Sequence, residues 1–516
     1  MGEALFLGLD IGTSGVKAIL VSTNGNVEAA ATTPLVLSTP RPGWAEQNPE
    51  DWWSAAVESI RDVMAQKPGA RIASIGISGQ MHSSVFLDRS GVVVRPALLW
   101  CDGRTTAECA EITQKAGGEE RLRDWVRNPA LEGFTLPKVL WLRNHEPDAY
   151  ARVATIVLAK DYIRYRLTGE LATEPSDASG TLMFDPADLR WSDEILEATG
   201  VPRRLLPEVG GSSDVLGRLT SDASRSTGIA YGTPVVGGGA DNACGAAGVG
   251  VITPGDAVAS WGTSGTVLAP TAQPLVDPKL RAHTFCHVAP GVWYVMGVVL
   301  SAGGAFAWYR DQLAREFAGA PGADAALDTE AASIPPGADG VTFLPYLQGE
   351  RTPHRDASAR GAFLGLSLAH TRAHLTRAVL EGIAFALRDS LSILQELGLS
   401  PQHLLLTGGG AKSPFIRRLQ EDVYGIPVST VNREEGPAYG AALLAAVGVG
   451  AFADLASAAR ATLTRGAPAS PDSQAHRAYQ AAYERFRESY SLMRDPRLCR
   501  EDGDSSTAAL TRLRSE

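Results

Sequence analysis

Short apolar runs separated by tight polar turns dominate the first part of the chain and predict β-strands. Residues 5–10 and 16–22 are two such runs, and the glycine-containing turn 12–15 joins them. An Asn-Gly pair at 24–25 then leads into a third β-prone run at Val27. Asn-Gly between such runs is a strong hairpin signal. We therefore expect a hairpin at the start of the chain that continues into a third strand.

Helical spacing of apolar residues follows this strand pattern. Asn48 suits the N-cap of a helix that has Pro49 at its first position. The i, i+3, i+4 spacing predicts one buried face on this helix, made of Trp53, Ala56, Val57, Ile60, Val63 and Met64. A fourth strand is expected at 72–77, a long helix at 371–397 and a charged helix at 474–492. This mixture of strands and helices predicts an α/β fold class.

The length and the charge of the chain exclude several classes of protein. The 516 residues suit two or more domains, each with its own core. A net charge of −10 argues against a nucleic-acid binder, which needs a basic surface to displace counterions. The five cysteines form no CxxC pair and are expected to be reduced. Since neither a signal-peptide pattern nor an apolar run of about 18 residues is found, we expect a cytoplasmic protein without a membrane partner.

One four-residue sequence occurs twice. Gly-Thr-Ser-Gly at 12–15 recurs at 262–265, each time between β-prone segments. Chance recurrence of common loop residues is one interpretation. The copies lie near the beginnings of the two halves of the chain, however, where a duplicated domain would place them. Turns of this kind present backbone N–H groups that suit phosphate binding.

Glycine and proline mark a domain boundary near the middle of the chain. Gly250 and the Pro254-Gly255 pair interrupt the sequence between residues 249 and 256. We expect two large domains, a helical extension and a polar tail, over residues 1–250, 251–450, 451–494 and 495–516.

Asp10 is the first candidate for chemistry. It ends an apolar strand and faces the glycine-containing turn, with Lys17 close behind. Phosphoryl transfer needs a carboxylate to hold Mg²⁺ near the phosphates, and backbone and hydroxyl donors for the phosphate oxygens. An aspartate that only caps a hairpin is the alternative.

Asp241 is the second candidate. Val235 and Val236 end a strand, a run of three glycines makes a turn, and Asp241 stands where a helix should begin. It could be the N-cap of that helix. It could also be a general base at the carboxyl edge of a sheet, where open α/β folds bind ligands. A dinucleotide site is disfavoured because the glycines lack the G-x-G-x-x-G spacing.

Two more segments follow strand ends. Gly408 to Gly410 come between a strand and a helix, and glycines there let an adenine or a phosphate approach the backbone. Gln80, Met81 and His82 follow the strand 72–77, which favours ligand contact, although a structural histidine is the commoner case. Cys286, His287 and His283 are interpreted as packing residues, because no second cluster completes a metal site.

Taken in order, these segments resemble the FGGY family of carbohydrate kinases. Residues 133–145 match the first signature of the family. The second signature is matched from Gly361, Phe363, Gly365 and Leu366 on to His374, Leu375, Ala378, Val379, Leu380 and Glu381. The resemblance covers about residues 4–450. It implies a two-lobed, actin-like ATPase (ribonuclease H-like) fold of duplicated domains, with ATP and sugar in the cleft between a sugar-binding first lobe and a nucleotide-binding second lobe.

The resemblance also implies roles for individual residues. Asp241 matches the base that takes the proton from the attacking sugar hydroxyl, and Asp10 matches the aspartate near Mg²⁺ and the transferring phosphate. The two Gly-Thr-Ser-Gly turns resemble phosphate loops, and residues 408–410 resemble the adenosine loop. The nucleotide contacts expected on this basis are Gly12, Thr13, Ser14, Lys17, Gly262, Thr263, Gly409, Gly410 and Ser413.

Within the family, three segments resemble the xylulokinase branch. They are residues 80–82, 100–104 and 346–353, and glycerol kinases differ at Met81, His82 and Asn242. Cys101 departs from the asparagine that is common at its position. The resemblance implies D-xylulose as the substrate, with sugar contacts from Met81, His82, Trp100, Asp102, Asp241 and Asn242.

Other functions remain open from the sequence. Ribulose, gluconate and glycerol are alternative substrates within the kinase class. A nucleotide-dependent conformational ATPase would share the lobed architecture, since fold does not determine function. The sequence leaves the oligomeric state open, with a homodimer as one outcome.

Overall fold

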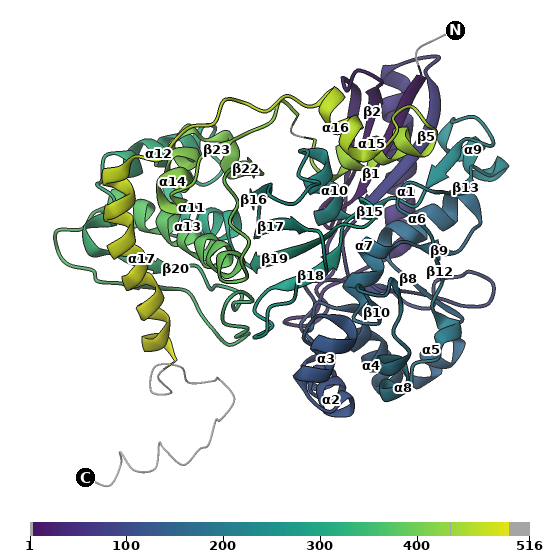
Figure 1. The fold of residues 1–516 in the computed structure, drawn as a ribbon, viewed down its shortest axis with the longest axis horizontal. Helices are drawn as coiled ribbons and strands as arrows, with labels where there is room; N and C mark the ends of the chain where they lie inside the picture. The colour runs from purple at the N-terminus through teal and green to yellow at the C-terminus, as the bar shows by residue number, and fades with distance from the viewer. Residues whose placement is uncertain (1–3, 434, 495–516) are drawn as a thin grey trace.

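The computed structural model describes residues 4–433 and 435–494, which form two lobes, each built around one β-sheet (Figure 1). The sheet of the first lobe has the strand order β13–β14–β5–β1–β2–β3, and β15 also pairs with β5. Strands β1, β2 and β3 are antiparallel, whereas β5 and β14 continue the sheet beyond β1 in parallel. The bounds are β1 (Ala4–Ile11), β2 (Gly15–Ser22), β3 (Val27–Pro34), β5 (Arg71–Gly79), β13 (Val215–Arg218), β14 (Pro234–Val236) and β15 (Gly239–Ala240).

The sheet of the second lobe repeats this topology. Its order is β18–β19–β17–β16–β22–β23, in which β16, β17 and β19 are antiparallel and β22 and β23 continue in parallel beyond β16. Its strands are β16 (Ala257–Trp261), β17 (Gly265–Thr271), β18 (His283–Cys286), β19 (Trp293–Val299), β22 (Leu404–Thr407) and β23 (Val428–Ser429). Each Gly-Thr-Ser-Gly sequence joins the first two strands of its sheet. The predicted fold class, a two-lobed actin-like ATPase fold with duplicated α/β domains, is confirmed.

Helix α1 (Pro49–Gln66) covers one face of the first sheet and begins as expected. The side chain of Asn48 accepts a hydrogen bond from the Glu50 N–H, and Pro49 is the first helical residue. The expected buried face is wrong in part. Trp52 is fully buried and Trp53 is only half-buried. The Trp52 indole N–H donates to Gln47 Oε1 (2.9 Å). This partner satisfies the one polar group of the side chain, so the Trp52 ring can be fully buried.

The opposite face of the first sheet is covered by a helix from the far end of the sequence. Helix α15 (Pro437–Gly448) packs on β1 and β5, and α16 (Leu455–Thr462) lies beside it (Figure 1). The approach is close: a Cβ on Gly8 would lie 2.0 Å from Ala438 O, and one on Gly76 would lie 1.9 Å from Ala441 O. Helix α15, from the second half of the sequence, therefore packs on the sheet of the first lobe. The domain boundary expected near residues 249–256 stays a prediction.

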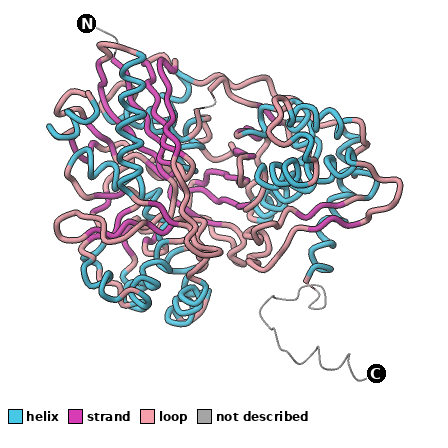
Figure 2. The backbone as a smooth tube through the Cα atoms, turned by 180° about the vertical axis from the view of Figure 1, so that it is seen from behind, coloured by secondary structure: helices cyan, strands magenta, loops and turns pink. Residues whose placement is uncertain are grey.

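The remaining helices surround the strands of the two lobes, as the view from behind shows (Figure 2). A helical part of the first lobe contains α2 (Thr106–Ala116), α3 (Glu119–Val126), α4 (Thr135–His145), α5 (Pro147–Arg152), α6 (Ala159–Thr168), α7 (Pro175–Ala178), α8 (Asp193–Thr199) and α9 (Ser221–Thr227). The second lobe contains α11 (Gly303–Gln312), α12 (Ala323–Ala332), α13 (Arg372–Glu396), α14 (Pro414–Tyr424) and α17 (Ser473–Met493).

The two longer helices predicted from the sequence are present. Helix α13 begins after Thr371 and supplies much of the apolar core of the second lobe, and α17 packs against this lobe from outside. The polar tail predicted for 495–516 lies outside the described residues. Within the described part of the chain, no helix combines the length and the apolar character needed to cross a membrane.

The contact between α15 and the first sheet gives a prediction for stability. Gly76→Ala places a methyl group against the backbone of α15, which cannot move without shifting the helix. We expect the free energy of unfolding to fall by roughly 1–3 kcal/mol, the usual cost of overpacking. Urea denaturation measures it. Gly466→Ala is the control, because its new Cβ would lie 3.4 Å from Thr430 O, an ordinary contact. Equal stability of the two variants would contradict this close packing.

Candidate active site

Asp10 lies at the carboxyl end of the central strand of the first sheet. Its cross-strand neighbours are Lys17 on β2 and Ser78 on β5. The residue is half-buried, but its Oδ1 atom is inaccessible to solvent and has no hydrogen-bond partner. A buried carboxylate oxygen without a partner is costly, so this atom is suited to bind a cation or a donor group of a ligand.

Asp241 reaches the same edge of the sheet. Ala240 is the N-cap of α10 (Asp241–Gly248), and Asp241 is the first helical residue. The N-cap interpretation is therefore wrong. Asp241 Oδ1 accepts hydrogen bonds from the backbone N–H (2.7 Å) and the side-chain amide (3.0 Å) of Asn242. That amide also lies 3.6 Å from the sulfur of Met81, so the segment after β5 and the start of α10 meet here.

Burial raises the pKa values of both carboxyl groups, and the charge of Asp10 also acts on Asp241. Burial raises the pKa of Asp10 to about 6, although the Ser78 hydroxyl and the Lys17 charge oppose it. Burial and, after it, the charge of Asp10 raise the pKa of Asp241 to about 7, although the Asn242 donors oppose this. Buried titratable groups with perturbed pKa values that lie close together are typical of functional sites.

His82 has an unusual backbone that two other side chains hold in place. Its φ angle is +67°, in the left-handed region. The Thr135 hydroxyl and the Lys138 ammonium both donate to its carbonyl oxygen at 3.1 Å. Lys138 also donates to Gly133 O (2.6 Å), and burial lowers its pKa to about 7. The sequence offered the signature that contains these two residues but no indication that they support His82.

The His82 ring is fixed as a neutral imidazole. Its Nδ1 lies 2.5 Å from Gly180 O. Because a carbonyl oxygen can only accept, Nδ1 carries the proton and Nε2 is an acceptor. Burial, with the positive charges of Lys138 and Arg351, lowers the pKa of His82 to about 3. The ring therefore offers one uncharged acceptor nitrogen.

Trp100 and Thr13 belong to one hydrogen-bond network. The Trp100 indole donates to the Thr13 hydroxyl (2.9 Å), which donates to Gln80 Oε1 (2.8 Å). The Gln47 amide donates to the Thr13 backbone carbonyl (2.7 Å). A residue expected to contact the sugar and a residue expected to contact phosphate are thus directly joined. Gln47 had no signal in the sequence.

Two of the expected contact residues have protein partners. Both carboxylate oxygens of Asp102 accept hydrogen bonds from the Arg104 guanidinium, and Asp102 Oδ2 also accepts from the Ala45 N–H (2.6 Å). Lys17 forms an ion pair with Glu435. The contacts of Asp102 are those of a positioning residue. A direct sugar contact by Asp102 and a phosphate contact by Lys17 stay predictions, and each would require exchange of these partners.

The second lobe brings its expected nucleotide residues together around a hollow of about 760 Å³. The N-terminus of α11 forms one wall, with the Gly303 N–H donating to Gly262 O (2.8 Å) and the Gly304 N–H to Thr263 O (2.9 Å). A Cβ on Gly303 would lie 2.6 Å from Gly262 O. The expected lining residues are Gly262, Thr263, Gly409, Gly410 and Ser413, and the sequence analysis missed Trp261, Gly303, Gly304, Arg310 and Asp324.

Ser413 has a structural role at the edge of this hollow. Its hydroxyl accepts from the Ile416 N–H as the N-cap of α14 and donates to Asp328 Oδ2 (2.5 Å). Gly303 and Gly304 begin α11 a few residues after β19, and this glycine pair after a strand is the signal in the sequence that could have indicated the hollow. It is the same pattern that drew attention to residues 408–410.

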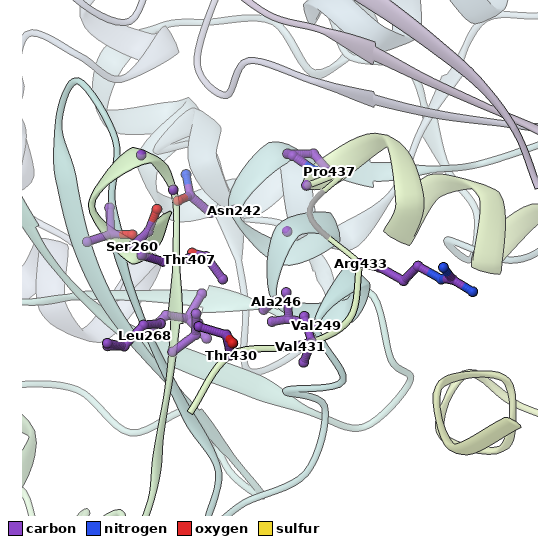
Figure 3. Close-up of a pocket in the computed structure, with 18 of the residues that line it drawn as sticks. Asn242, Ala246, Val249, Ser260, Leu268, Thr407, Thr430, Val431, Arg433 and Pro437 are labelled. Carbon is purple, nitrogen blue, oxygen red and sulfur yellow. The ribbon is translucent and has the colours of Figure 1, made fainter. Parts of the chain in front are cut away.

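A cavity of about 390 Å³ lies between the start of α10 and the glycine loop at 408–410 of the second lobe (Figure 3). Asp241 and Asn242 line it from the start of α10, whereas Ser260, Thr407 and Gly409 line it from the second lobe. Figure 3 shows Ser260 and Asn242 close together at one end and the Arg433 side chain directed away. The candidate catalytic carboxylate and the candidate nucleotide loop therefore share one cavity.

The donor set at Asp10 fits Mg²⁺ bound together with a phosphate ligand. Within the described residues, no group of three or more His, Cys, Asp or Glu side chains could hold a metal ion. Mg²⁺ commonly keeps several waters and takes only one or two carboxylates plus substrate phosphates. The unpartnered Asp10 Oδ1 is such a carboxylate oxygen.

Comparison with known proteins gives a consistent match over nearly the whole chain. Residues 5–248 match the model of the N-terminal domain of the FGGY family of carbohydrate kinases, and residues 257–449 match that of its C-terminal domain. The xylulose kinase of Bacillus subtilis (strain 168) is 39% identical over 95% of this chain and 97% of its own length.

Solved structures agree with this match. The crystal structure of a "xyloylose kinase" from Brucella ovis superposes with a TM-score of 0.87 at 37% identity, covering 95% of this chain and 99% of that one. A gluconate kinase structure from Lactobacillus acidophilus gives 0.89 at 27% identity, covering 95% and 98%.

The raised pKa of Asp241 predicts a pH-dependent cost to stability. Below about pH 4 the carboxyl group is protonated in both folded and unfolded chains and costs nothing. As the pH rises to about 7, the unfolded chain ionises while the folded one resists, so the folded state loses stability. In magnesium-free buffer, we expect Asp241→Asn to be more stable than the parent at pH 8 and similar to it near pH 4. Urea unfolding at both pH values measures the free energy of unfolding of the two proteins. If their difference in stability is the same at pH 4 and pH 8, the raised pKa of Asp241 is contradicted.

Proposed function

Because the chain belongs to the FGGY family of carbohydrate kinases, we propose that it transfers the γ-phosphoryl group of ATP to the 5-hydroxyl of D-xylulose. The main support is the position of Asp241, which lies beside Met81 and Asn242 at one end of a cavity that reaches the glycine loop of the second lobe. The relatives named as xylulose kinases support the choice of sugar.

Asp241 is suited to act as the general base. A base with a pKa near the operating pH combines a populated carboxylate with enough basicity to remove a proton, and its pKa is about 7. The proton of the sugar 5-hydroxyl passes to Asp241 as that oxygen bonds to the γ-phosphorus. The bond from the γ-phosphorus to the bridging oxygen breaks, and ADP leaves.

The first lobe would hold the sugar. His82 Nε2, as an uncharged acceptor, can accept a hydrogen bond from a sugar hydroxyl. Asn242 donates to Asp241 and keeps its carboxylate oriented toward the cavity. Met81, which lies beside Asn242, and Trp100, which donates to Thr13, would supply further contacts to the sugar.

The turns at 12–15 and 262–265 and the hollow beside Gly409 would hold the phosphates and the nucleoside. Mg²⁺ bound at Asp10 would neutralise charge on the phosphates. Closing the lobes over both ligands would exclude water, which otherwise competes with the sugar for the phosphoryl group. ATP as the donor agrees with the cytoplasmic location expected from the sequence.

The substrate assignment is tested by ADP release from ATP and Mg²⁺ with one sugar at a time. The panel is D-xylulose, D-ribulose, L-ribulose, gluconate and glycerol, with gluconate included because of the structural similarity to a gluconate kinase. We expect strong stimulation by D-xylulose alone. Stimulation by another member would keep the kinase and overturn the sugar. ATP hydrolysis that ignores every sugar would favour a conformational ATPase.

The role of the base is tested by Asp241→Asn, which keeps the size and most hydrogen bonds of the side chain. Since general bases contribute about 10²–10⁴-fold, we expect kcat to fall by that factor. The KM for ATP should change little, because the nucleotide is held mainly by the second lobe. Near-normal turnover would show that another group takes the proton.

A further inference from the structure

A cluster of charged side chains is buried behind the catalytic carboxylate. Its members lie on α6, on α7 and just before α7, and each is no more than 1% exposed: Lys160, Asp161, Arg164, Glu174 and Asp177. Lys160 Nζ lies 2.7 Å from Asp161, 3.5 Å from Glu174 and 3.4 Å from Asp177. Burying so many charges is expensive unless they are paired and serve a purpose.

Glu174 is the best-connected member of this cluster. Its side chain caps α7 by accepting from the Ser176 N–H and the Asp177 N–H, both at 2.9 Å. It also accepts from the hydroxyls of Ser176 and Ser212, both at 2.7 Å. Each serine hydroxyl therefore directs its hydrogen at Glu174. Its oxygen can still accept a hydrogen bond from another group.

The remaining acceptor site of the Ser176 hydroxyl faces the strand that directly precedes Asp241. The Ala240 N–H donates to Ser176 Oγ at 2.9 Å. Ala240 ends the two-residue strand β15, which pairs with Ser78 and Gly79 of β5 on its other side. So short a strand cannot fix its own position. It is held between β5 and the Ser176 hydroxyl.

The surroundings of β15 leave little freedom for movement. A Cβ on Gly238 would lie 1.9 Å from Ile77 O, and one on Gly239 would lie 2.2 Å from the Val288 side chain. Ser176 Oγ lies 3.3 Å from that same position on Gly239. The backbone just before Asp241 is therefore in close contact with its neighbours, and Ser176 is one of them.

We propose, on the basis of the proposed function, that Glu174 acts through Ser176 as a positioning residue for Asp241. The relay runs from the Glu174 carboxylate to the Ser176 hydroxyl and on to the Ala240 N–H, one residue before the base. Lys160 Nζ lies 3.5 Å from Glu174 Oε1, the same oxygen that accepts from the Ser176 hydroxyl. Catalysis depends on such placement, because a displacement of about 1 Å can cost on the order of 10²-fold.

The electrostatics of the cluster support the same arrangement. Burial raises the pKa of Asp177 well above its usual value, Lys160 opposes this, and the charges of Asp161, Glu174 and Asp241 raise it further. Neither oxygen of Asp177 has a hydrogen-bond partner. The charge of Asp241 makes the smallest of these contributions, so Asp177 lies within electrostatic range of the candidate base.

Two serines on the same carboxylate provide a matched test. Ser176→Ala removes the relay to β15. Ser212→Ala removes a hydroxyl with the same 2.7 Å contact to Glu174, while its backbone carbonyl still accepts from the Gly238 N–H. With the sugar that stimulates the parent protein, we expect Ser176→Ala to lower kcat by about 10- to 100-fold at unchanged KM for ATP, and Ser212→Ala to stay within about twofold. The two thermal midpoints should fall similarly.

A double variant separates positioning from general damage. In the Asp241→Asn background, Ser176→Ala should cost no further activity, because there is no base left to position. Three results would overturn the proposal. They are a further loss of activity in the double variant, an equal loss of kcat in the two single serine variants, and an unchanged kcat in Ser176→Ala. If the parent protein phosphorylates no sugar at all, it is the proposed function that fails, and the two failures are therefore distinguishable.

Discussion

The active site depends on two carboxyl groups that the fold brings to one sheet edge against their mutual repulsion. Asp10 lies at the carboxyl end of β1 and Asp241 begins α10, on opposite sides of the carboxyl end of β5. Each is partly removed from water, and the charge of Asp10 raises the pKa of Asp241. This arrangement lowers stability without ligands, but it yields a base of suitable strength beside an oxygen that can take a cation.

The rest of the first lobe offsets this cost by holding neighbouring backbone rigidly. Asn242 donates twice to Asp241, Thr135 and Lys138 hold the left-handed His82, and Trp100, Gln80 and Gln47 surround Thr13. Helix α15 closes the other face of the sheet at backbone contact distance. Together these interactions let unfavourable charges and dihedral angles persist where a ligand can use them.

Sequence reasoning succeeded where the signal was local and failed where it depended on distant partners. Strand ends, glycine turns and the start of α1 follow from propensities, so the positions of Asp10, Asp241 and both Gly-Thr-Ser-Gly turns could be predicted, while their roles stay predictions. Glu174 and Lys160 could not, because nothing in their own segments shows that they meet behind β15. Apolar periodicity places Trp53, and not Trp52, on the buried face of α1, because it cannot anticipate the hydrogen bond from Trp52 to Gln47.

The duplicated hairpins show how one sequence serves two tasks. The Gly12 N–H bonds to Gly15 O, whereas the Gly262 N–H bonds to Ser264 O, so the same four residues form different turns. Ser260 in the second copy stands two residues before its turn, where the first copy has Asp10. The second hairpin therefore supplies no carboxylate and is free to face the nucleotide hollow. The candidate base Asp241 and the candidate metal ligand Asp10 both come from the first lobe, so the proposed phosphoryl transfer requires the second lobe to bring the nucleotide to them.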